Sequence, residues 1–113
     1  MSSYLTDEQY AAQIRKKIVT TAAAMLDAKL SFIEGARALM PLLEEANVFY
    51  DDPDRMIFCE IDSSTDAYPV GTVRAHWSVE ALNQLQPEID EAEKRVREVG
   101  KDACEALIRR FNV

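Results

Sequence analysis

The 113-residue chain has few of the residues that build common catalytic and ligand sites. Its three glycines, Gly35, Gly71 and Gly100, stand far apart. A phosphate-binding loop and a dinucleotide fingerprint both need clustered glycines, so neither motif is present. The single histidine, His76, and two widely spaced cysteines do not make a zinc-binding pattern. We therefore expect no cofactor and no metal.

The chain also has no long hydrophobic run. No apolar stretch approaches the roughly 18 residues that a membrane-spanning helix needs. The first ten residues, MSSYLTDEQY, have neither the basic start nor the apolar centre of a secretory signal. Both cysteines have apolar neighbours and are expected to be buried and reduced. These features predict a cytoplasmic protein with no membrane partner.

Hydrophobic residues make up 48% of the chain and charged residues 29%, as in a soluble folded domain. A chain of this length buries enough surface for a core without disulfides or metal. We expect one globular domain over residues 1–113.

Basic residues are nearly missing from residues 44–66. This segment has eight acidic residues and one basic residue, Arg55, which gives it a charge of −7, equal to that of the whole chain. The acids are Glu44, Glu45, Asp51, Asp52, Asp54, Glu60, Asp62 and Asp66. Such a field attracts a protein partner with a basic surface and argues against a nucleic acid. The short basic run Arg15-Lys16-Lys17 is typical of a solvated helix face.

Helix-capping signals mark the first two helices. Thr6-Asp7-Glu8-Gln9 fits a capping box and predicts a first helix over about 7–29. Ser31 begins a second capping box, and the apolar spacing that follows predicts helix over about 32–46. Pro41 lies inside this second pattern and should kink or break it.

The last helix is expected to begin at Pro87, because proline suits the first position of a helix. Its apolar stripe runs to Phe111 with the spacing of an ordinary amphipathic helix, and Gly100 within it permits a close helix crossing. A short helical turn should precede it, with Ser78 as the cap.

Two strands are predicted between the second and last helices. Residues 47–55 have the composition of a turn-rich loop, and residues 56–61 are rich in strand formers. Residues 68–74 form a weaker candidate, which Pro69 and Gly71 would place at an edge.

The expected fold class is therefore α+β and mostly helical, in the order α-α-β-β-α. Two long antiparallel helices, the first and the last, should pack with the broken second helix. A short β-hairpin or extended segment at 56–74 should cover one side.

The acidic segment is also flanked by aromatic residues, a combination that protein interfaces often use. We expect a non-enzymatic binding protein that caps a basic partner, most specifically an immunity-type inhibitor of a toxin domain. The expected contact residues are Asp51, Asp52, Asp54, Asp62, Asp66, Phe49, Tyr50 and Tyr68.

Two other functions fit the same residues. A small enzyme, or a metal- or ligand-binding protein, could be built around Cys59, Asp62 and His76, with Cys59 and His76 as a nucleophile pair in the enzyme. Alternatively, the chain could be a structural homodimer that pairs through an exposed helix face. The sequence fits a monomer as well as a homodimer.

Three segments resemble a family of small uncharacterised bacterial proteins. They are Leu30-Ser31-Phe32-Ile33-Glu34-Gly35-Ala36-Arg37, Asp51-Asp52-Pro53-Asp54, and Val70-Gly71-Thr72-Val73-Arg74 followed by Trp77-Ser78. The resemblance covers roughly residues 20–111 and implies no residue roles. In size and acidity the chain is also similar to immunity proteins, which share no single fold.

Overall fold

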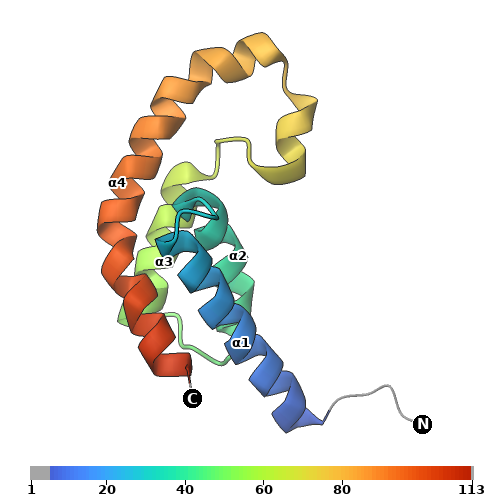
Figure 1. Ribbon diagram of the computed structural model, residues 1–113, viewed down its shortest axis with the longest axis vertical. Helices are drawn as coiled ribbons and strands as arrows, with labels where there is room; N and C mark the ends of the chain where they lie inside the picture. The colour runs from blue at the N-terminus through green and yellow to red at the C-terminus, as the bar shows by residue number, and fades with distance from the viewer. Residues whose placement is uncertain (1–5, 113) are drawn as a thin grey trace, which may run out of the picture.

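The computed structural model describes residues 6–112, and within them it contains four α-helices and a short 3₁₀ helix (Figure 1). These are α1 (Asp7–Leu26), α2 (Phe32–Glu45), α3 (Pro53–Thr65), η1 (Gly71–His76) and α4 (Val79–Phe111). No residue in this range is in a β-strand. The predicted α+β class is therefore wrong, and the fold is a helical bundle.

The segment predicted as the first strand, 56–61, lies inside α3. Phe58, Ile61 and Thr65 are its buried residues, and their spacing of three and four places them on one helix face. The composition of 56–61 favours a strand, but burial against α2 and α4 decides in favour of the helix.

The loop predicted at 47–55 contains the start of α3. The Asp52 carboxylate accepts hydrogen bonds from the backbone N–H of Asp54 (3.0 Å) and of Arg55 (3.3 Å), which makes it the N-cap. Pro53 takes the first helical position, where it has no hydrogen bond to lose. The pattern Asp-Pro-Asp was therefore a helix start and not a turn.

The second predicted strand is wrong as well. Residues 71–74 belong to η1, which begins at Gly71 with a φ of +59°. Pro69 is buried ahead of it, and the Gly71 N–H donates to the Glu34 carboxylate on α2 (3.1 Å). These contacts take the place of the backbone hydrogen bonds that would have joined the two strands of a hairpin.

The predictions for α1 and α2 are confirmed apart from their ends. The Thr6–Gln9 capping box is present in full, and Ser31 accepts from the Glu34 N–H at the start of α2. Helix α1 ends at Leu26 because Ala28 has a φ of +60°. Pro41 lies inside α2, which runs on to Glu45 as one helix, so the predicted break in the second helix is wrong.

The last helix begins eight residues earlier than expected. Ser78 is its N-cap, and α4 runs through Pro87 without ending, so the predicted separate turn is the start of a 33-residue helix. A proline inside a helix costs about 3 kcal/mol. Packing of the buried face, which begins at Ile89, offsets that cost.

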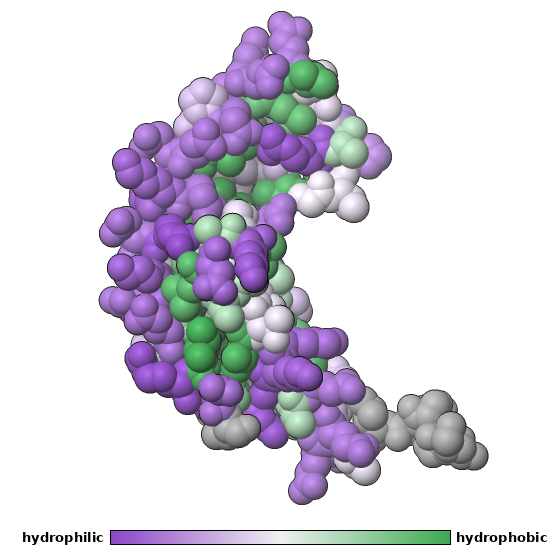
Figure 2. Space-filling model, in the orientation of Figure 1, coloured by the Kyte–Doolittle hydropathy of each residue, from purple (hydrophilic) through white to green (hydrophobic). Residues whose placement is uncertain are grey.

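The core forms where α1, α2 and α3 pack against α4. Helices α1 and α4 run in opposite directions, as predicted, and α4 arches along one edge of the molecule (Figure 1). Figure 2 shows hydrophobic side chains inside this arch and a hydrophilic outer edge. A Cβ atom on Gly100 would lie 3.1 Å from the Phe32 ring and 2.9 Å from Ile61, so glycine permits this close crossing.

Beyond the bundle, residues 67–88 form a hook that turns back at the far end of α4 (Figure 1). It consists of the last residues of the segment that joins α3 to η1, then η1 itself and the first turns of α4. A hydrogen bond from the Arg74 guanidinium to Gln86 (2.7 Å) ties η1 to α4. Tyr68, Val70 and Leu85 pack against the core, so the hook is held by these apolar contacts as well as by its hydrogen bonds to Gln86 and Glu34.

Candidate functional site

The eight predicted contact residues separate into two groups at the two ends of α3. Phe49, Tyr50 and Asp51 lie in the loop before α3, with Asp52 and Asp54 at its first turn. The other group, Asp62, Asp66 and Tyr68, lies in the last turn of α3 or just beyond it. Thirteen helical residues span about 20 Å, so the groups form two surfaces.

The α2–α3 loop, residues 46–52, presents two aromatic side chains to solvent. Phe49 is 76% exposed and Tyr50 is 82% exposed. The neighbouring Val48 is buried, and its carbonyl accepts a hydrogen bond from Arg55 (2.6 Å). The loop is therefore anchored in the core while its two aromatic side chains are left without core contacts.

Two of the predicted aspartates are already paired with a base from α4. The Asp52 carboxylate lies 2.7 Å from the Arg110 guanidinium, and that of Asp54 lies 3.6 Å from it. Burial raises the pKa of Asp52, but the hydrogen bonds from Arg110 and Arg55 outweigh it and lower the pKa overall. Burial, together with the nearby charge of Asp52, raises the pKa of Asp54. These two acids help to fix the C-terminal end of α4.

Asp62 also has an internal partner. Its carboxylate lies 3.6 Å from the Arg37 guanidinium, which donates a further hydrogen bond to the Thr65 carbonyl. Within residues 6–112, Asp51 and Asp66 make no ion pair, and both are exposed. Only these two of the five predicted aspartates are therefore fully available to a partner.

Tyr68 lines an open groove on the hook, with a volume of about 480 Å³. The groove lies between the residues that follow α3 and the first turns of α4. The residues that line it are Ala67, Tyr68, Trp77, Ala81, Gln84, Leu85 and Glu88. The Tyr68 hydroxyl donates to the Glu88 carboxylate (3.2 Å). Burial and this hydrogen bond raise the pKa of Tyr68.

Sequence reasoning missed Leu85 and Glu88 as groove residues. Leu85 comes just before the predicted helix start at Pro87 and Glu88 just after it, so the two were not placed on one helix face with Ala81. The helical spacing of Ala81, Leu85 and Glu88, at intervals of four and three, was the available signal.

The alternative site around Cys59, Asp62 and His76 is not assembled by hydrogen bonds. Cys59 is exposed on α3, so the expectation of a buried thiol is wrong for it. Asp62 faces Arg37, and His76 is exposed at the end of η1. Throughout the described chain, no hydrogen bond joins any two of these residues, and no three His, Cys, Asp or Glu side chains are placed to hold a metal ion.

Cys104 is buried beside Met25, with 3.9 Å between the sulfur atoms. Burial raises the pKa of its thiol to about 12. A thiolate is the reactive form of cysteine, so this group should be inert in the native state.

The two thiols should therefore react at very different rates. We expect a disulfide reagent at neutral pH to modify Cys59 at once and Cys104 only after unfolding. The pKa of the Cys104 thiol is raised from 9.0 to about 12, so as the pH rises this thiol ionises in the unfolded chain before it ionises in the native protein. The free energy of unfolding should therefore fall as the pH rises between those values. Absorbance titration of native and denatured protein, with Cys59→Ser as control, counts the thiols. Equal rates for both thiols would contradict the buried placement.

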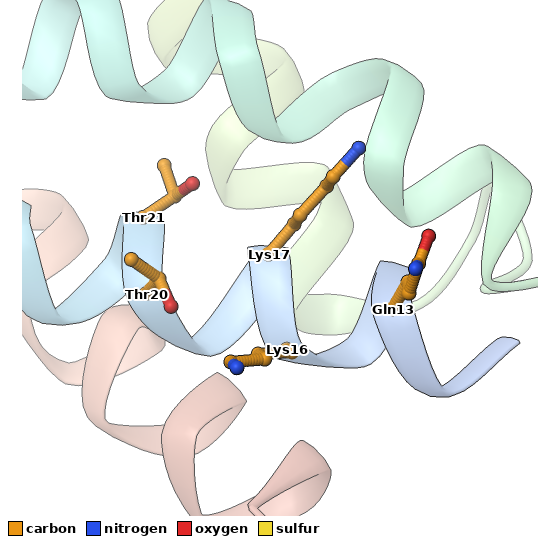
Figure 3. A pocket seen from close by; sticks show the side chains of 5 residues that line it. All are labelled: Gln13, Lys16, Lys17, Thr20 and Thr21. Atoms are coloured by element: carbon orange, nitrogen blue, oxygen red, sulfur yellow. The ribbon is translucent and has the colours of Figure 1, made fainter. Parts of the chain in front are cut away.

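A further hollow of about 430 Å³ lies along α1 (Figure 3). Five side chains of this one helix line it: Gln13, Lys16, Lys17, Thr20 and Thr21. Lys17 extends toward α2 while Lys16 points elsewhere, so the lysines do not converge on one point (Figure 3). This agrees with the prediction of a solvated basic face.

Comparison of the chain with protein-family models, with curated proteins and with solved structures gave no significant match. The resemblance to a small bacterial family stays a prediction. Across residues 6–112, no helix combines the length and the apolar character needed to cross a membrane.

Proposed function

We propose that the chain is a cytoplasmic, non-enzymatic binding protein that docks onto a basic partner protein through its α2–α3 loop. The observation that carries this proposal is the exposure of Phe49 and Tyr50, at 76% and 82%. Adjacent aromatic side chains held outside the core leave apolar surface in contact with water. Burying this surface against a partner is favourable in free energy. Aromatic residues dominate interface hot spots for this reason.

Acidic residues around the two aromatics support a basic partner. Glu44 and Glu45 are exposed just before the loop and Asp51 is exposed within it, and the Tyr10 hydroxyl donates to Glu45. Charges at the rim of an interface speed association more than they add affinity. The aromatic pair would supply the desolvated contact, and the acids would steer the encounter.

In its most specific form, the proposal is an immunity-type inhibitor that occupies the basic cleft of a toxin domain. A toxin that acts on nucleic acid needs such a cleft for phosphate groups. Carboxylates on the loop could take the positions of the phosphates, while Phe49 and Tyr50 pack against the walls. The acidic composition and the small size of the chain support this version.

The double variant Phe49→Ala/Tyr50→Ala tests the proposal. A partner is first isolated on the tagged protein from the cells that express it, at about 50 mM and about 500 mM salt. We expect one stoichiometric basic partner that salt weakens, and a loss of affinity of about 100-fold or more in the variant, since each aromatic is a hot-spot candidate. Calorimetry or surface-based kinetics measures the affinity.

A matched control separates the loop from general apolar exposure. Val99 is also an exposed apolar residue, on α4, so Val99→Ala should leave binding unchanged. The triple variant Glu44→Gln/Glu45→Gln/Asp51→Asn should slow association at low salt and leave dissociation nearly unchanged. Asp52 is kept because it caps α3. Unchanged partner affinity in the aromatic variant would refute the proposal.

A further inference from the structure

We propose that the groove on the hook is a second docking site, which receives a basic segment of a partner protein that carries a large apolar side chain. The groove and the α2–α3 loop lie at opposite ends of α3. The binding proposed for the groove can therefore be tested independently of the binding proposed for the loop.

The floor and walls of the groove are largely apolar. Tyr68, Trp77 and Leu85 come together from three separate segments of the hook, and Trp77 remains 39% exposed. The volume of about 480 Å³ is large enough to take a bulky side chain.

The surroundings of the groove are strongly acidic. Residues 60–93 contain eight acidic residues and one basic residue, Arg74, whereas the rest of the chain has equal numbers of each. Glu88 forms part of the wall, Asp66 precedes the lining residue Ala67, and Glu80 lies one helical turn before Gln84. The first bases of α4, Lys94 and Arg95, come after the last groove residue.

Charge complementarity therefore selects the occupant. An apolar side chain fills the groove, and flanking lysine or arginine side chains reach the carboxylates of Asp66, Glu80 and Glu88. A second copy of the chain is a poor occupant, because its exposed aromatics, Phe49 and Tyr50, are themselves surrounded by acids. Docking them in the groove would bring like charges together.

Trp77 is the only tryptophan, and it lines the groove, so its fluorescence reports occupancy directly. The probe is a labelled helical peptide of about four turns in which leucine forms one face and lysine the other. Its counterpart carries glutamate in place of every lysine. With the lysine peptide we expect a saturable shift of Trp77 emission to shorter wavelength, weakened at about 500 mM salt. The glutamate peptide should give no shift.

Variants in the groove test whether the contact is local. Glu88→Lys should weaken binding of the lysine peptide about tenfold or more, and Glu88→Gln, which keeps an acceptor for Tyr68, should weaken it less. Glu91→Lys is the matched control, because it makes the same charge change on α4 outside the groove lining. Leu85→Ser should also weaken binding, and circular dichroism checks that each variant is folded.

Several results would overturn the proposal. One is the lack of any Trp77 shift at peptide concentrations up to about 1 mM. Another is equal weakening by Glu88→Lys and Glu91→Lys, which would show attraction to the general field only. A third is binding that survives in Leu85→Ser and is lost in Phe49→Ala/Tyr50→Ala, which would assign the peptide to the loop. A Trp77 shift that depends on protein concentration alone would identify a second copy as the occupant.

Discussion

Replacing Phe32 by alanine should lower the free energy of unfolding by about 3–5 kcal/mol, a large part of the stability of a small domain. Phe32 is fully buried at the start of α2, where its ring lies against the backbone of α4 at Gly100. The Arg97 guanidinium sits 5.2 Å above the ring centroid. Truncation would leave a cavity and remove this cation–π contact.

Urea unfolding followed by circular dichroism measures this loss. Phe49→Ala is the matched control: the same side chain is removed from a site that is 76% exposed, so its effect should stay within about 0.5 kcal/mol. A Phe32→Ala protein as stable as the control would show that α2 does not pack on α4 as described.

Replacing Glu93 by alanine should cost about 2–3 kcal/mol. The Glu93 carboxylate on α4 accepts hydrogen bonds from the backbone N–H of Phe32 (2.7 Å) and of Ile33 (3.2 Å). It therefore caps the N-terminus of α2 with a full negative charge, in the position that the helix dipole favours. Its loss would leave two buried donors without their acceptor.

The same unfolding experiment checks this value, with Glu91→Ala as control, since Glu91 is exposed on the same helix. Glu93→Gln should lie between the wild type and Glu93→Ala, because the amide oxygen still accepts but carries no charge. If Glu93→Ala and Glu91→Ala have the same stability, the cap does not contribute to folding.

Local signals were enough to predict the helices that begin with a capping residue. Thr6, Ser31 and Ser78 each cap the helix that was expected after them. The error at α4 came from giving Pro87 more weight than Ser78. A proline costs one hydrogen bond, whereas the apolar face that continues on both sides of it contributes over many residues.

The strands were wrong because a six-residue apolar segment fits either a strand or one buried helix face. Residues 56–61 have the composition of a strand, but the decisive residues lie outside them: Asp52 caps the helix, and Thr65 continues its buried face. Whether such a segment becomes helical depends on the surfaces against which it packs, here α2 and α4.

The site could be predicted only in part for a related reason. Phe49 and Tyr50 are exposed, and their contact role stays a prediction. The pairing of Asp52 with Arg110 joins residues 58 positions apart, and the Tyr68–Glu88 hydrogen bond joins residues 20 apart. A charge count along the chain does not include such pairing, so it overestimated the net negative charge at the start of α3.

The corner between α1 and α2 is held by residues that lie 61 to 72 positions further along the chain, on α4. One turn after Glu93, Arg97 donates to the carbonyls of Met25 (3.2 Å) and Leu26 (2.8 Å), so α4 holds the end of α1 and the beginning of α2 together. Between these two anchored ends lie Ala28, with a φ of +60°, and the partly buried Leu30. Recombination that separates this corner from α4 would therefore disrupt both helix ends at once.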